Sequence, residues 1–246
     1  MSPRVIPRVM RSVMRSGVRC SPRWPSRGSR TLLLALGCAA LASCDTPTAS
    51  RPVAAYDPTT LTGGLTYRWA SGTTVRVWVA GQETPAPFDL GIAVRRAMVQ
   101  WNAVPQFAEF TLATAASAGE ADLIVYDREQ PAPTLAGSCT FDPRNAAGYT
   151  YFCPGGGQPP RAERLRLTSD DMRSVSVVIR VDRGRASSQA ALNALVAHEF
   201  GHALGIGGHS DEPSDLMFGL PTVESPGARD RATLRDVLGR ISGLTL

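Results

Sequence analysis

The three histidines of this chain, His198, His202 and His209, lie within twelve residues of one another. His198 and His202 are four residues apart, so on an α-helix their imidazoles share one face and can reach a single cation. Glu199 lies about 100° further round the helix, close to such a cation without being obliged to bind it. Imidazole ligands beside a carboxylate indicate zinc-assisted hydrolysis, with Glu199 accepting a proton from the attacking water.

The residues that follow the two helical histidines strengthen this interpretation. A HExxH pattern by itself also occurs on helices that bind no metal. Gly205, however, stands where a left-handed turn would end the helix, a conformation that glycine adopts without steric cost. The chain would then turn back beneath the metal and bring His209 as a third ligand.

The stretch HEFGHALGIGGHS, followed by DLMFG, resembles the metzincin zinc proteases and, among them, the matrixins. The family pattern is HExxHxxGxxH with a later methionine turn, and the resemblance is strong over residues 187–240. It implies a zinc endopeptidase with one catalytic zinc and a metzincin-like fold. It also implies that Gly205 and Met217 support the site, with Met217 eight residues beyond the last histidine.

Two departures narrow this assignment. Gly219 stands where the astacin-like metzincins have a tyrosine near the metal, so the matrixins are the better match. The chain has no histidine outside the motif, so the second, structural zinc of animal matrixins cannot be built in the usual way. Calcium binding through a loop carboxylate such as Asp142 stays open, without support from the sequence.

The motif contains one glycine more than the family pattern. An extra residue between His198 and His202 would rotate one ligand off the helix face, but the insertion lies after the helix. We expect Gly207 and Gly208 to adopt φ values that absorb it and still present His209. Asp211 is the alternative third ligand, because a carboxylate is also a zinc donor.

The order of the expected strands and helices predicts an α+β fold. This fold is a twisted mixed β-sheet with an N-terminal helix, an active-site helix and a C-terminal helix. Asp89 and Ser187 or Ser188 are expected to cap the first two helices. Apolar and β-branched runs predict strands, and 3.6-residue periodicity predicts helices. The strands are expected within 65–80 and at 110–113, 122–126, 149–153 and 175–181, and the helices at 90–101, 190–205 and 228–241.

The family resemblance also suggests where substrate binds. By order of elements, Tyr149 to Cys153 would be the edge strand beside the cleft, where an extended polypeptide can add as a further strand. Tyr149 and Tyr151 are therefore predicted substrate contacts. Pro221 is expected to wall the pocket for the residue after the scissile bond.

The N-terminus resembles a bacterial lipoprotein leader. Residues 1–43 carry eight arginines and no acid, and they end in the apolar run TLLLALGCAALAS, which is too short to span a bilayer. Cys44 completes a lipobox-like LASC, which implies lipidation, membrane anchoring and an extracytoplasmic location. An ordinary cleaved signal peptide is the alternative. We expect residues 44–64 to be a flexible tether and 65–246 to be the protease domain.

Charge and cysteine content limit the partners of the mature chain. The chain has 26 basic and 21 acidic residues, so removing eight leader arginines leaves 18 against 21. A basic surface for nucleic acid is therefore not expected, and we expect a monomer acting on polypeptide. Cys139 and Cys153 are predicted to form a disulfide worth about 3 kcal/mol, with two free thiols as the alternative.

Three functions fit these residues. The first is an extracytoplasmic zinc endopeptidase, and the second is a lipoprotein that keeps the fold and binds zinc without turnover. The third is a zinc hydrolase of cell-wall peptides. Glu199 favours an enzyme over a binding module, because a module without turnover has no need of a base there.

Overall fold

The computed structural model describes residues 55–62, 64, 66, 68–69, 71–80, 87–105, 109–131, 146–154 and 175–239. The chain divides into two units, Met1–Ala49 and Ser50–Leu246, and every described residue belongs to the second. The predictions for Cys44, Cys139 and Asp142 therefore fall outside the described residues, and the side chain of Cys153 is not described either. Within the described part, no helix has the length and apolar character needed to cross a membrane.

Five strands form one mixed sheet in the order β2-β1-β3-β5-β4. Four of them run parallel, and β4 at one edge pairs antiparallel with β5. This arrangement confirms the predicted α+β class with its mixed sheet. The strands are β1 (Thr73–Val79), β2 (Phe110–Thr114), β3 (Leu123–Asp127), β4 (Gly148–Pro154) and β5 (Val175–Val181).

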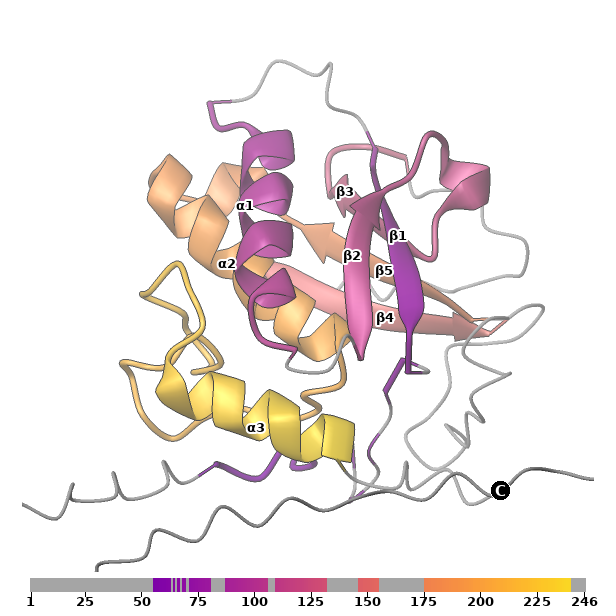
Figure 1. Ribbon diagram of the computed structural model, residues 1–246. Coiled ribbons are helices and arrows are strands. Elements are labelled where there is room, and N and C mark those ends of the chain that lie inside the picture. Colours follow the sequence, from indigo (N-terminus) through magenta and orange to yellow (C-terminus); the bar gives the residue numbers. More distant parts are fainter. Residues whose placement is uncertain are drawn as a thin grey trace, which may run out of the picture. The chain divides into compact units, whose positions relative to one another are not determined.

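The described residues include three α-helices, of which α1 and α2 lie side by side against the sheet (Figure 1). Helix α1 (Leu90–Asn102) begins at Asp89, whose side chain accepts a hydrogen bond from the Ile92 amide. Helix α2 (Gln189–Ala203) begins at Ser188, which caps the Ala191 amide in the same way. Both predicted caps are confirmed. Helix α3 (Ala228–Gly239) follows the loops that come after α2.

Two short 3-10 helices complete the described secondary structure: η1 (Ala118–Glu120) and η4 (Arg183–Arg185). The second leads from β5 to α2, and it is fixed by a buried ion pair. Arg183 Nε donates to Asp127 at the end of β3 over 2.7 Å, and both side chains are about 95% buried. This pair fastens the chain just before the helix that carries the first two histidines.

The core lies between the sheet and the two packed helices. Trp101 of α1 is fully buried, and its indole Nε1 donates to the carbonyl of Ala197 on α2 at 2.8 Å. On β5, Val177, Ile179 and Val181 point into this core, as the period of two in a strand requires. Helix α2 is therefore held on one side by α1 and on the other by the sheet.

Part of the segment 44–64, which we expected to be a flexible tether, is docked on the domain. Tyr56 is buried, its amide donates to Thr233 Oγ1 at 3.2 Å, and its hydroxyl donates to Asp230 at 2.9 Å. The prediction was wrong for this part because both partners lie about 175 residues away in α3. Local composition carries no trace of contacts at such a separation.

Candidate metal centre

Helix α2 carries His198 and His202, and Gly205 ends it. Gly205 has φ of 115°, a value that other residues rarely adopt. Its amide donates to the carbonyl of His202 at 3.0 Å, and the Ile206 amide donates to the carbonyl of Gly201 at 3.0 Å. These two bonds form a Schellman motif, which turns the chain back past the end of the helix. Gly205 therefore ends the helix in the left-handed turn predicted for it.

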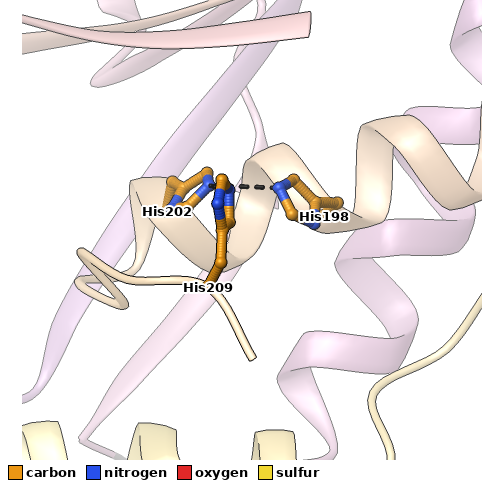
Figure 2. A group of neighbouring side chains, drawn as sticks. All are labelled: His198, His202 and His209. Carbon is orange, nitrogen blue, oxygen red and sulfur yellow. Dashed lines mark hydrogen bonds between the residues drawn. The ribbon is translucent and has the colours of Figure 1, made fainter. Parts of the chain in front are cut away.

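The three histidine rings face one another (Figure 2). The Nε2 atom of His202 lies 3.1 Å from Nε2 of His198 and 3.2 Å from Nε2 of His209. His198 Nδ1 lies 2.9 Å from the carbonyl of Leu216, and His202 Nδ1 lies 2.7 Å from the carbonyl of Ile206. Since a carbonyl only accepts, both Nδ1 atoms carry the proton, and the Nε2 lone pairs point at the shared centre.

This donor set fits zinc. With Zn–N distances of about 2.0–2.1 Å, the nitrogens of a tetrahedral site lie about 3.3 Å apart, close to the separations found here. Burial lowers the pKa of His198 to about 4 and also lowers the pKa of His202 and His209. The rings are therefore neutral near pH 7, the form that binds a metal. The three-histidine group can thus hold a metal ion.

The loop after α2 presents His209 to the centre and directs Asp211 elsewhere. The Ser210 amide donates to the carbonyl of Met217 at 2.8 Å, and Ser210 forms a β-bridge with Phe218. Asp211 is 79% exposed and accepts a hydrogen bond from Arg229 at 2.8 Å. Of the two candidates for third ligand, the structure therefore brings His209, and not Asp211, to the helical pair.

The physical reason expected for the extra glycine was wrong. Neither Gly207 nor Gly208 has a positive φ among the described residues. A Cβ atom on Gly208 would instead lie 2.5 Å from the carbonyl oxygen of Asp57 and 2.6 Å from Thr60 Oγ1, and one on Gly207 would collide with Thr62. The two glycines are needed because another segment of the chain packs directly against them.

Met217 is fully buried and packs against α2 at Gly201; its predicted role in supporting the histidines stays a prediction. A Cβ atom on Gly201 would collide with Met217 Sδ and lie 3.1 Å from Trp101. Sequence reasoning missed Gly201, because a glycine inside a helix gives no local sign of what crosses it.

Asp230 of α3 fixes the chain around Met217, and sequence reasoning missed it too. Its fully buried carboxylate accepts hydrogen bonds from the amides of Leu216, Met217 and Gly227 at 2.8–3.1 Å. The bond from Gly227 satisfies a free amide at the start of α3, as in a capping box. The bond from Leu216 holds the residue whose carbonyl orients His198.

Glu199 points from α2 toward the edge strand β4. The Thr150 hydroxyl donates to its carboxylate at 2.7 Å and lies 3.1 Å from its carbonyl oxygen. Gly148, two residues earlier on the same face of β4, leaves room for this carboxylate, since a Cβ there would lie 2.5 Å from Glu199 Oε1. Burial raises the pKa of Glu199 to about 7, although Thr150 and Arg180 act in the opposite direction.

Strand β4 lies at the edge of the sheet, as predicted, because β5 is the one strand that pairs with it among the described residues. The rings of Tyr149 and Tyr151 lie 4.5 Å apart, with Tyr149 partly exposed and Tyr151 buried. Pro221 is half-buried in the loop after Met217. The substrate contacts expected of these three residues stay predictions.

The chain is similar to a known protein family and to solved structures of a protease. A family model described as Matrixin matches residues 78–237. Two solved structures of myroilysin are also similar: one is 14% identical, covering 70% of this chain and 86% of that chain with a TM-score of 0.39. The other is 15% identical, covering 70% of this chain and 96% of that chain with a TM-score of 0.38. No curated protein matches the chain.

Proposed function

The chain belongs to the matrixin family of zinc peptidases, and from this premise we propose that it is a zinc endopeptidase that cleaves extracytoplasmic proteins with Glu199 as general base. The observation that carries the proposal is the meeting of three neutral imidazoles through their Nε2 atoms. The family supports zinc over other metals, because matrixins are zinc enzymes, and three imidazoles are a donor set that zinc accepts.

Each residue of the centre then has a defined task. His198, His202 and His209 hold the zinc, and the carbonyls of Leu216 and Ile206 keep two of the rings in the required tautomer. When bound, zinc acts as a Lewis acid that polarises a substrate carbonyl and makes water a stronger acid. Gly205 and Met217 support the loop and the floor of the site.

Glu199 moves the proton. Its carboxylate accepts a proton from the water that attacks the peptide carbonyl, and it then delivers that proton to the leaving amine. In the metal-free protein, burial raises the pKa of this carboxyl, which favours its holding the proton between the two transfers. Thr150 holds the carboxylate against β4, where an extended substrate would pass.

Substrate binding is assigned to the edge of β4 that pairs with no other strand among the described residues. An extended polypeptide would pair with this strand through main-chain hydrogen bonds, with Tyr149 and Tyr151 next to it on the face of β4 opposite Thr150. Pro221 would border the pocket beyond the scissile bond. Main-chain pairing accepts many sequences, which supports polypeptide as the substrate class.

The location of the enzyme is proposed from the leader. The arginine-rich residues 1–43 and the LASC sequence support export, lipidation of Cys44 and anchoring to a membrane. A disulfide between Cys139 and Cys153 would suit such an oxidising location.

The proposal is tested by incubating the purified protein with an unstructured protein substrate, with and without a zinc chelator. We expect cleavage that stops on chelation, returns with added zinc and falls at least about 100-fold in Glu199→Gln. Cleavage that survives chelation, or that is unchanged in Glu199→Gln, would refute the proposal. Zinc binding without any cleavage would instead identify a binding module.

A further inference from the structure

The connection between α2 and His209 is covered by a segment from the other end of the domain. Residues 204–208 are all buried, although they form a loop between a helix and a metal ligand. The cover includes residues 57–62, here called the docked segment. Its Leu61 amide donates to the carbonyl of Gly207 at 2.8 Å.

Several residues of the docked segment lie close to the two glycines. The backbone of Asp57 and the Thr60 hydroxyl approach Gly208, and Thr62 and the carbonyl of Pro58 approach Gly207. No side chain larger than hydrogen fits at either glycine without moving the docked segment. The glycine pair and the docked segment therefore match each other in shape.

The docked segment has its own internal bonds. Asp57 accepts hydrogen bonds from the Thr59 amide and hydroxyl at 2.9 and 2.7 Å. The carbonyl of Thr59 accepts from the Thr62 amide at 3.0 Å. These bonds hold the docked segment in a turn.

Two successive carbonyls of the connection accept hydrogen bonds from different parts of the chain. The carbonyl of Ile206 accepts from His202, a residue of the centre, and the carbonyl of Gly207 accepts from Leu61, a residue of the docked segment. His209 follows after Gly208, which has no side chain to anchor it.

We propose that the docked segment, residues 57–62, is a positioning element of the metal centre that holds Gly207 and Gly208 so that His209 meets His198 and His202. Two adjacent glycines without this cover would sample many backbone conformations. His209 would then face the centre for only a fraction of the time. The affinity for zinc would fall in proportion to that fraction.

This inference rests on the proposed zinc centre, and its test uses the metal affinity directly. Leu61→Pro removes the amide that donates to Gly207. Leu61→Ala is the matched control, because the Leu61 side chain is 59% exposed and the control keeps the amide. Gly208→Ala attacks the same contact from the other side, and Gly239→Ala, with open space around it, is its control.

Two measurements are made on the otherwise unchanged protein. Competition with a chromogenic chelator gives the zinc dissociation constant. Hydrogen exchange of the metal-free protein compares peptides covering 204–210 with peptides covering the first half of α2. We expect Leu61→Pro and Gly208→Ala to weaken zinc binding about 10-fold or more relative to their controls. Exchange should quicken at 204–210 and stay unchanged in α2.

The outcomes separate this inference from the proposed function. If the parent protein binds no zinc, the proposed function fails, and this inference fails with it. If the parent binds zinc and both variants bind it as tightly as their controls, only the positioning role is overturned. Weaker binding in either variant, with α2 still protected from exchange, supports the role.

Discussion

Thr150 of β4 donates a hydrogen bond of 2.7 Å to the carboxylate of Glu199 on α2. The bond joins the strand assigned to substrate with the residue assigned to proton transfer. Strand β4 therefore holds the carboxylate of Glu199 and is also the strand along which the peptide is proposed to lie. The position of the base relative to the substrate is thus fixed by one strand.

Replacing Thr150 tests this link. Thr150→Val keeps the shape and removes the donor, so we expect kcat to fall about 10-fold or more, because a misplaced base is not aligned with the water. Thr150→Ser keeps the hydroxyl and should retain most of the activity. Steady-state kinetics on one peptide separate kcat from KM. A loss confined to KM would assign Thr150 to substrate binding instead.

Gly201 should tolerate substitution poorly, because Met217 and Trp101 lie where its Cβ atom would be. Gly201→Ala forces a Cβ atom into Met217 and Trp101, so we expect the free energy of unfolding to fall by about 1–3 kcal/mol. Gly239→Ala, with nothing near its Cβ position, is the control. Urea denaturation monitored by tryptophan fluorescence measures both. Equal stability of the two variants would contradict the contact.

Breaking the buried ion pair before α2 should lower the free energy of unfolding far more than breaking an exposed pair. Arg183→Met leaves Asp127 buried without its cation, which we expect to cost about 3–5 kcal/mol of unfolding free energy. Arg76→Met breaks the exposed pair with Asp122 and should cost less than about 1 kcal/mol. Denaturant midpoints compare the two variants, and similar losses would show that burial does not set the cost.

Acid should destabilise the metal-free protein through His198. Folding lowers the pKa of His198 from 6.5 to about 4, so unfolding takes up a proton between these values. The contribution of His198 to stability is therefore constant above pH 6.5, and it falls by about 3 kcal/mol as the pH drops to 4.

Protonation of Glu199 stabilises the folded protein in acid, which opposes the loss of stability caused by His198. The loss is therefore best measured in a variant without this carboxyl group. Its pKa is raised from 4.5 to about 7, so its contribution is present below pH 4.5 and lost as the pH rises through 7. We expect metal-free Glu199→Gln to show a steeper loss toward acid than the parent protein. Urea titrations from pH 7 to 4 measure the stability of both proteins as a function of pH. Parallel curves would contradict the raised pKa of Glu199.

The parts of the site that sequence predicted are those fixed by local rules. The spacing of His198 and His202 follows from helix geometry, and Gly205 ends the helix because of a backbone preference. The strands and helices were found near their predicted bounds, since apolar periodicity reports which face is buried.

The parts that sequence missed depend on contacts far along the chain. The bond from Thr150 to Glu199 spans 49 residues, and docking of Tyr56 on α3 spans 174. The alternation in GYTYF does place Thr150 on the face opposite Tyr149 and Tyr151. That pattern could not reveal which residue the hydroxyl would meet.

The central claim is that three imidazoles bind one zinc ion, and zinc content tests it most directly. Atomic absorption after gel filtration should give one zinc per chain in the parent protein and in Asp211→Ala, and much less in His209→Ala. Undiminished zinc in His209→Ala, with loss in Asp211→Ala, would contradict the account.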